Sequence, residues 1–319
     1  MNITRRQFLY IAGTTALIPM HVRAAEEQVT ILVGYPAGGA PDLVARSIGI
    51  GLRDQNITAV VENKSGAAGR LGIDNLLRAP RNGKFLLLLP SSNLTLYPHY
   101  FNDLRYDSKK DFSLLASVAE YSFALAINPK IPAKTLKEFM NWAENNKNQA
   151  QFGTPGVGSG PYFLGNYLQK LGGFHLQHIP YRGGAPALTD TIGGTIAAVF
   201  TTTPNLIKPH RSGQLRILAH SGAQRIPSIA DVPTFAESGF AELSLRDRFV
   251  IVSSSKEEQS VQESRAKQLS SAAVVPAVTT LLSEAEFIPN VLGGEQLKVE
   301  INSEYKRWGN IVQAINNHS

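Results

Sequence analysis

Residues 28–52 read QVTILVGYPAGGAPDLVARSIGIGL, a strand pattern joined to a helix pattern through a turn with two adjacent glycines. The apolar run at 29–33 is typical of a buried β-strand, and the residues from Asp42 onward follow a helical pattern. Gly38 and Gly39 let the backbone approach a ligand closely, and Pro41 suits the first turn of a helix, where no N–H is needed. The exposed N–H groups and partial positive charge of a helix start favour an anion. This stretch therefore predicts a strand–turn–helix unit with an anion site at its turn.

Similar turns recur at three further strand ends. Residues 152–162 read FGTPGVGSGPY, residues 178–188 read HIPYRGGAPAL, and residues 86–93 read LLLLPSSN, which adds hydroxyl and amide donors. In open α/β sheets, ligands bind at the carboxyl ends of strands, where helix N-termini point. A glycine-rich turn is also compatible with a tight connection that binds nothing. The G-x-G-x-G spacing from Gly156 misses the dinucleotide fingerprint, and no phosphate-loop lysine is found, so a carboxylate is favoured over a nucleotide.

Strand-like and helix-like segments alternate along almost the whole chain. The expected strands are residues 29–33, 59–63, 84–90, 123–129, 151–153, 178–181, 197–203, 215–220 and 248–254. The expected helices are residues 42–52, 71–79, 135–146, 162–171 and 187–194. This alternation predicts an α/β fold of mostly parallel sheets flanked by helices, and about 295 residues after the N-terminal segment suggest two domains. Because no low-complexity linker separates the two, residues 123–129 and 248–254 are expected to cross between the lobes as strands.

The N-terminal segment has the pattern of an export signal. Arg5 and Arg6 precede an apolar run at residues 8–18, and a small-residue cleavage site ends at Ala24. The run is shorter than the roughly 17–25 residues of a membrane-spanning helix and ends at Pro19. The paired arginines predict twin-arginine export, with cleavage near Ala24. We therefore expect a soluble periplasmic protein.

The charge and the cysteine content narrow the class of partner. Loss of Arg5, Arg6 and Arg23 with the signal lowers the formal net charge from +6 to +3, and no basic block remains. Nucleic acid is therefore not an expected partner. The chain has no cysteine, which excludes disulfides and a lipid-modified N-terminal cysteine. A domain of this size buries a sufficient core without disulfides.

Motifs of catalysis, metal binding and cofactor binding are weak or missing in the sequence. Residues 253–256, SSSK, match S-x-x-K, but a serine-rich stretch does so by chance and the companion K-T-G is missing. His175 and His178 would lie on opposite faces of one strand and make a poor metal pair. H-E-x-x-H and G-x-S-x-G are both absent from the sequence. We expect no catalytic residue, no metal and no cofactor.

Seven motifs in order make the chain resemble the Bug-type periplasmic solute-binding proteins, the receptors of tripartite tricarboxylate transporters. The motifs are YPAGGAPD (35–42), VVENKSGAAGRLG (60–72), LRYDSKKDFSLLA (104–116), FALAINPKIPAKTLKEF (123–139), FGTPGVGSG (152–160), HIPYRGGAPALTDTIGGTI (178–196) and AQRIPSIADVPTFAESGF (223–240). The resemblance implies a type II-like binding protein, in which two lobes close by a hinge motion around a small carboxylate. It implies a monomer that captures a di- or tricarboxylate or an aromatic carboxylate for the membrane subunits of a transporter.

The resemblance also implies which residues contact the ligand. Backbone groups of the first turn, together with water, would hold a carboxylate from one lobe, and turns of the second lobe would complete the site. The candidates are Tyr35, Gly38, Gly39, Asp42, Ser91, Asn93, Thr154, Gly156, Ser159, Tyr162, Arg182, Gly183, Gly184, Ala185, Thr201 and Thr202. Asp42 also lies where an aspartate commonly caps a helix.

The chain departs from the family pattern at several of these positions. Many members have threonine at the position of Pro41, an Asp-Asn pair at Thr201–Thr202 and an aromatic residue near 246–248. Here Arg246 and Arg248 become candidates for binding a second carboxylate, because a guanidinium matches a carboxylate in bidentate fashion. The alternative is that these arginines form surface salt bridges, because only one face of the strand can line the cleft. These departures leave the identity of the ligand open. A chain that has lost ligand binding would show the same departures.

We assign residues 1–24 to the signal, residues 25–121 and 246–319 to lobe 1, and residues 122–245 to lobe 2. Two other functions remain open at this point: a periplasmic hydrolase or isomerase on the same fold, and a ligand-sensing component of a signalling system. Turnover of a bound carboxylate would favour the enzyme, for which the sequence offers no nucleophile–base pair.

Overall fold

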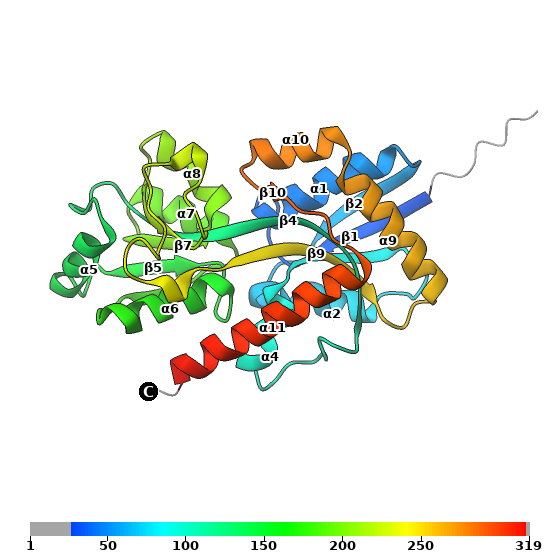
Figure 1. Cartoon of the computed structure of the whole chain (residues 1–319), viewed down its shortest axis with the longest axis horizontal. Coiled ribbons are helices and arrows are strands. Elements are labelled where there is room, and N and C mark those ends of the chain that lie inside the picture. Colours follow the sequence, from blue (N-terminus) through cyan, green and yellow to red (C-terminus); the bar gives the residue numbers. More distant parts are fainter. Residues whose placement is uncertain (1–26, 317–319) are drawn as a thin grey trace, which may run out of the picture.

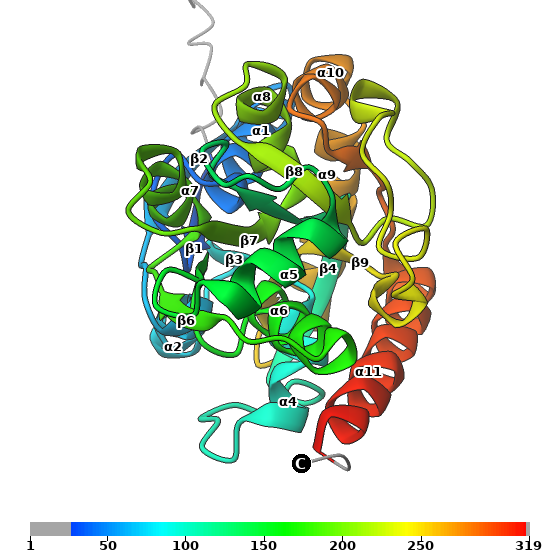
Figure 2. The ribbon, with the colours of Figure 1, turned by 90° about the vertical axis from the view of Figure 1, so that its left-hand side faces the viewer.

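The computed structural model describes residues 27–316 of the chain, and the expected signal peptide lies outside these residues. Figure 1 shows two α/β lobes side by side, joined by two long strands, β4 and β9. In Figure 2, in which the second lobe faces the viewer, α8 and α6 lie on opposite sides of its strands. The expected two-lobed α/β class is therefore confirmed.

The strands occur where the apolar runs predict them. They are β1 (Glu27–Val33), β2 (Ile57–Asn63), β3 (Phe85–Pro90), β4 (Phe112–Ile127), β5 (Gln151–Thr154), β6 (Gln177–Pro180), β7 (Ala198–Thr202), β8 (Arg216–His220), β9 (Arg246–Ser254) and β10 (Ile288–Pro289). The first half of β4 and the short β10 are additions to the predicted set.

The helices alternate with these strands. They are α1 (Ala40–Arg53), α2 (Arg70–Arg78), α3 (Ser92–Thr95), α4 (Tyr97–Tyr100), α5 (Leu136–Asn145), α6 (Gly160–Gly172), α7 (Gly184–Gly193), α8 (Thr203–Arg211), α9 (Gln259–Ala273), α10 (Pro276–Glu284) and α11 (Gly294–Asn316). Three short 3-10 helices lie at Ala67–Gly69, Pro227–Ile229 and Ala241–Leu243. Within residues 27–316, no helix is both long and apolar enough to cross a membrane.

The strands form one continuous sheet in the order β2-β1-β3-β9-β4-β7-β5-β6. In the first lobe β1 pairs in parallel with β2 and β3, and in the second lobe β5 pairs in parallel with β6 and β7. The two crossing strands run antiparallel to each other. Parallel strands bring their carboxyl ends to one edge, so each lobe presents its strand-to-helix turns on the side facing the other lobe.

Strand β4 changes partners in its middle. Its residues up to Ser122 pair with β9, and its residues from Phe123 to Ile127 pair with β7, while β8 pairs with the same end. This switch is the reason for the lobe boundary that we propose at residues 121–122 and 245–246. Figure 1 shows α11 running beneath both lobes, and Lys170 Nζ of α6 donates a hydrogen bond to the carbonyl of Ile315.

Candidate functional site

Four helices begin around one cavity between the lobes. The N-caps of α1, α6, α7 and α8 are Gly39, Ser159, Gly183 and Thr202, and all four line the cavity. Its volume is ≈ 50 Å³, which is room for only a few water-sized groups. Because each helix start carries a partial positive charge, the four together favour an anion.

The backbone donors at three of these helix starts have no side-chain acceptor. Ser159 caps α6 by accepting a hydrogen bond from the amide of Tyr162 at 3.4 Å. Gly39, Gly183 and Thr202 make no side-chain capping hydrogen bond within the part of the chain that the structure describes. The first N–H groups of a helix have no partner inside the helix. The turns of α1, α7 and α8 therefore offer N–H groups to a bound anion.

The crossing strands form the floor of the cavity. Tyr121 and Phe123 of β4 and Asp247 and Phe249 of β9 line it, in alternation along each strand. Tyr121 pairs directly with Asp247 in the sheet, and the rings of Tyr121 and Phe249 lie 4.6 Å apart. The floor is therefore aromatic, with one carboxylate in it.

The lining contains polar groups but no cationic side chain. Within residues 27–316, no lysine, arginine or histidine lines this cavity. The hydroxyl groups of Thr201 and Thr202 line it, are buried, and have no hydrogen-bond partner among the described residues. A Cβ at Gly184 would lie 2.4 Å from Thr201 Oγ1, so the glycine leaves room for this hydroxyl. Positive potential at the site therefore comes from helix starts, and the two hydroxyls are free to donate.

Asp42 holds the first turn in shape. Its Oδ2 accepts hydrogen bonds from the amide of Gly38 and from Arg46 Nε, both at 2.9 Å, and its Oδ1 accepts one from Asn63 Nδ2 at 3.0 Å. Burial raises the pKa of Asp42, but these hydrogen bonds outweigh it and hold that pKa below its usual value. Asp42 is buried and is not among the lining residues, so it supports the turn from behind.

A strained loop supports the same turn. Ala67 and Ala68 have φ of 48° and 52°, which L-residues other than glycine rarely adopt. The carbonyl of Ala68 accepts hydrogen bonds from Tyr97 Oη (2.6 Å), Tyr35 Oη (3.0 Å) and Asn93 Nδ2 (3.2 Å). Burial raises the pKa of Tyr35, which stays a neutral donor to this carbonyl. The loop thereby fixes the Tyr35 ring that lines the cavity.

The structure brings eight of the predicted site residues to the cavity. They are Tyr35, Gly39, Ser159, Gly183, Gly184, Ala185, Thr201 and Thr202. The remaining candidates do not line it: Gly38, Asp42, Ser91, Asn93, Thr154, Gly156, Tyr162, Arg182, Arg246 and Arg248. We propose the eight lining residues as the ligand contacts.

Several of the residues behind the lining have other partners. Thr154 Oγ1 lies 2.7 Å from His178 Nε2, and burial lowers the pKa of His178 to about 4, which keeps that ring neutral. Gly156 meets the other lobe, because a Cβ built on it would lie 3.0 Å from Ala68 Cβ. Ser91 donates a hydrogen bond to the lining residue Asp247 (2.6 Å) and so supports the lining without being part of it.

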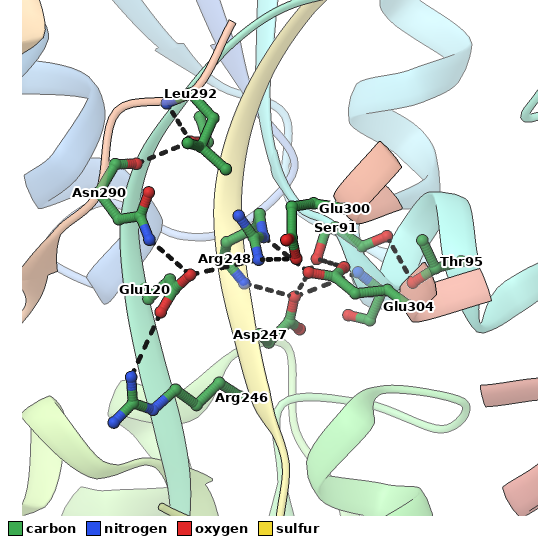
Figure 3. A network of polar contacts seen from close by, with 12 residues as sticks. Ser91, Thr95, Glu120, Arg246, Asp247, Arg248, Asn290, Leu292, Glu300 and Glu304 are labelled. Carbon is green, nitrogen blue, oxygen red and sulfur yellow. Dashed lines mark hydrogen bonds and ion pairs between the residues drawn. The ribbon is translucent and has the colours of Figure 1, made fainter. Parts of the chain in front are cut away.

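Arg246 and Arg248, the candidates for binding a second carboxylate, do not line the cavity. Figure 3 shows both arginines within a network of carboxylates. Arg248 Nε lies 2.6 Å from Glu304 Oε1, and its Nη2 lies 3.2 Å from both Glu120 and Glu300. Arg246, which is exposed, lies 3.4 Å from Glu120. Alternate residues of a strand point to opposite faces, and it is Asp247 that lines the cavity.

Sequence reasoning missed five lining residues that matter: Tyr121, Phe123, Asn205, Asp247 and Phe249. Strand alternation was the available signal, because it places Asp247 and Phe249 on one face of β9 and the two arginines on the other. It did not tell which face turns toward the cleft. Asn205 follows Pro204 at the start of α8, whose N-cap Thr202 was itself predicted.

The chain is similar to known proteins in both sequence and fold. The sequence profile described as "Tripartite tricarboxylate transporter family receptor" matches residues 44–317. Protein BugT of Bordetella pertussis is 27% identical over 324 residues, covering 98% of each chain. A solved structure described as a periplasmic transporter is 29% identical with a TM-score of 0.84, covering 91% of this chain and 97% of its own.

A further solved structure is MatC of Rhodopseudomonas palustris with bound malate. It is 23% identical, has a TM-score of 0.82, and covers 90% of this chain and 99% of its own. At this identity the likeness concerns the fold. The same two-lobed fold therefore holds a small dicarboxylate in that protein.

Proposed function

Because the chain belongs to the tripartite tricarboxylate transporter family of receptors, we propose that its interlobe cavity captures a small carboxylate for uptake by a membrane transporter. The family consists of periplasmic solute-binding receptors. The ligand is bound and released without chemical change. We further propose that the receptor is a monomer, and that it reaches the periplasm by twin-arginine export with cleavage near Ala24.

This proposal rests on the convergence of four helix starts on a cavity that no cationic side chain of residues 27–316 lines. A hydrogen bond to a charged group contributes about 1.5–3 kcal/mol, and a micromolar complex corresponds to about 8 kcal/mol. A few amide donors, with the hydroxyls of Thr201 and Thr202, would supply most of that free energy. The malate bound by MatC is an example of the size of ligand that this fold accommodates.

The two lobes are in close contact around the cavity. A Cβ on Gly183 would lie 2.9 Å from Pro36 Cδ, and one on Gly156 would lie 3.0 Å from Ala68 Cβ, and each pair spans the cleft. A ligand must therefore enter through an opened state. We place the hinge at the two crossing strands, near Ser122 of β4, where the partner strand changes, and near Arg246, where β9 begins.

The enzyme alternative receives no support from the cavity lining. Among the described residues that line the cavity, the only carboxylic acid is Asp247, and it hydrogen-bonds Ser91, which does not line the cavity. A nucleophile needs a base within hydrogen-bond reach and an open path to substrate, and Ser91 is fully buried. The sensor alternative differs only in its docking partner and shares the ligand site.

Native mass spectrometry of the protein purified from periplasm tests the proposed function. We expect a population with added mass equal to one small carboxylate, which is released intact on denaturation. Isothermal titration with a panel of mono- and dicarboxylates then gives its affinity. A protein that carries no carboxylate and binds none of the panel, or that converts one of them, would contradict the proposal.

A further inference from the structure

Asp247 is a buried carboxylate whose cavity side has no partner. The residue is 2% exposed and lines the interlobe cavity. Its Oδ2 is buried and forms no hydrogen bond among the described residues, and the Tyr121 hydroxyl lies near enough that burial and the Asp247 carboxylate together raise the pKa of that tyrosine. In Figure 3 only one of its two oxygens takes part in the dashed contacts. The other oxygen is available to a ligand.

The partnered oxygen of Asp247 is surrounded by donors. Its Oδ1 lies 2.6 Å from Ser91 Oγ and accepts hydrogen bonds from the amides of Arg248 (2.8 Å) and Ser92 (3.3 Å). Donors that converge on a carboxylate oxygen stabilise its ionised form. They also fix the orientation of the carboxylate, so Oδ2 is held in place before a ligand arrives.

The Ser91 hydroxyl lies within hydrogen-bond distance of two carboxyl groups behind the cavity. Ser91 Oγ lies 2.6 Å from Asp247 and 2.5 Å from Glu304 Oε2, but it can donate to only one of them. The other contact requires a proton on the carboxyl group. Burial raises the pKa of both acids, and that of Glu304 reaches about 7. Because Asp247 Oδ1 already accepts two amide hydrogen bonds, the arrangement that satisfies every contact places the proton on Glu304 and leaves Asp247 charged.

The charges of the network lead to the same assignment. The network contains two guanidinium groups, those of Arg246 and Arg248, and the carboxyl groups of Glu120, Glu300 and Glu304. Ser91 connects Asp247 to this network. Arg248 lies within 3.2 Å of a carboxyl oxygen of each of the three glutamates, and neither guanidinium makes an ion pair with Asp247 among the described residues. The negative charge of Asp247 therefore faces the cavity without a cation.

We propose that the ligand carries a protonated amine beside its carboxylate, and that the ammonium group pairs with Asp247 Oδ2. This inference rests on the proposed carboxylate site, to which it adds the second recognition element. The carboxylate lies at the helix starts, where the potential is positive, and the ammonium lies over the floor, where the charge is negative. The ligand class is a small amino carboxylate, and Asp247 is the residue that selects it.

An ammonium group satisfies this site better than a hydroxyl group or a second carboxylate. A buried charge without a counter-charge is costly, and an ion pair within the cavity removes that cost. A hydroxyl donates one hydrogen bond but leaves the charge of Asp247 unbalanced. A second carboxylate would be repelled, and no cationic side chain within residues 27–316 lines the cavity to attract it.

Matched ligand pairs test the inference on the unmodified protein. L-aspartate with succinate, L-glutamate with glutarate, and L-alanine with propionate each differ only by the amine, and L-malate replaces that amine with a hydroxyl. After removal of any co-purified ligand by unfolding and refolding, isothermal titration gives each affinity. We expect at least one amino member to bind ten-fold or more tightly than its partner, and more tightly than malate in the aspartate series.

The Asp247→Asn variant separates recognition from a structural role. It should lower the affinity for the preferred amino ligand at least ten-fold and leave or improve the affinity for its amine-free partner. Asp54→Asn, which removes an exposed carboxylate at the C-terminal end of α1, is the control and should change neither. A purely structural Asp247 would weaken both members equally, and that result overturns the inference.

The outcomes distinguish this inference from the proposed function. If succinate, glutarate, propionate or malate binds as well as or better than every amino member, the carboxylate site stands and the amine is refuted. If no carboxylate binds the unmodified protein and none is found by native mass spectrometry, the proposed function fails and the inference fails with it. The affinities of the unmodified protein decide this even if the Asp247→Asn variant does not fold.

Discussion

Asp247 and Glu304 share one hydroxyl group: Ser91 Oγ lies 2.6 Å from a carboxylate oxygen of the first and 2.5 Å from one of the second. Asp247 belongs to the strand that crosses between the lobes, and Glu304 belongs to the C-terminal helix α11. The contact therefore joins the floor of the cavity to an element more than fifty residues further along the chain. It also links the protonation state of Glu304 in α11 to the charge of Asp247 at the cavity.

This link predicts a pH-dependent stability. Burial raises the pKa of Glu304 from 4.5 to about 7, with the charge of Asp247 as a further cause and Arg248 opposing it. A pKa raised by folding gives stability that is complete below pH 4.5 and is lost as the pH rises through about 7. Glu304→Gln keeps the contacts of the protonated acid, because its amide donates to Ser91 and accepts from Arg248. Its melting temperature should therefore fall less than that of the unmodified protein over this range.

Thermal unfolding monitored by circular dichroism from pH 4.5 to 8 measures the difference. The groups that face this site are Glu120, Glu300, Asp247 and Arg248. Glu300→Gln, on the same helix but with its side chain 48% exposed, is the control and should keep the slope of the unmodified protein. Equal slopes in all three proteins would show that Glu304 does not carry the proton.

Gly39→Val should weaken ligand binding without unfolding the protein. Gly39 has φ of −82°, and an added Cβ would meet its nearest atoms, Pro36 O and Pro41 Cδ, at 3.4 and 3.8 Å, so the backbone tolerates a side chain. The valine would occupy the narrow cavity that Gly39 lines. We expect a loss of affinity of ten-fold or more by titration, with little change in melting temperature.

Gly38→Val is the matched control for that experiment. Gly38 has φ of +79°, where a β-branched residue is strained by roughly 1–2 kcal/mol, and it does not line the cavity. It should lower the melting temperature more than Gly39→Val and the affinity less. The reverse order would show that the turn is a structural connection and not the anion site.

The two arginines of β9 should differ in their effect on stability. Arg248 has a side chain that is 7% exposed and is ion-paired with Glu120, Glu300 and Glu304. Its removal leaves the mostly buried Glu120 with only the exposed Arg246 as its counter-charge, and breaking a buried pair costs about 3–5 kcal/mol. Arg246 has a side chain that is 43% exposed, and a surface pair contributes about 0–1 kcal/mol. Urea unfolding of the two alanine variants measures both values, and equal losses would contradict the assignment.

Export offers a prediction that depends on the sequence alone. Arg5→Lys combined with Arg6→Lys should stop export through the twin-arginine route and leave the precursor in the cytoplasm. Cell fractionation with immunoblotting shows the location, and N-terminal sequencing of the periplasmic form should begin close to Ala25. A lysine variant that still reaches the periplasm would indicate another export route.

The sequence predicts the turns of this site well because glycine acts locally. Gly183 is needed where the backbone approaches Pro36 of the other lobe, and the glycine-rich turn that provides this approach is visible in a few consecutive residues. The alternation of apolar runs and helical patterns likewise predicted the two-lobed α/β class. These features depend on neighbours in sequence.

The face of β9 that lines the cavity depends on distant neighbours. Tyr121 of β4 pairs with Asp247 of β9, and both residues face the cleft. This register is set by the pairing of the whole sheet. No helix was predicted after residue 254, but the polar stretch there leads into α9, where Arg265 donates hydrogen bonds to Glu27 and the carbonyl of Gly83. Tertiary contacts of this kind override local pattern.

The contact between Gly156 and Ala68 predicts that one disulfide can lock the cleft. A Cβ on Gly156 would lie 3.0 Å from Ala68 Cβ, and a small shift brings the pair to the usual disulfide separation of about 3.5–4.5 Å. The natural chain has no cysteine, so a Gly156→Cys, Ala68→Cys double variant has one possible intramolecular bond. Thiol titration before and after oxidation measures its formation.

Oxidation of this variant should trap whichever state of the cavity is present. Protein loaded with ligand and then oxidised should retain the ligand through dialysis, whereas protein oxidised when empty should fail to bind until a reductant is added. The oxidised and reduced forms contain the same substitutions, so any backbone strain at Gly156, with its φ of +150°, affects both equally. If the oxidised protein exchanges ligand as fast as the reduced protein, the lobes do not need to separate at this contact, and the hinge at β4 and β9 does not control access to the site.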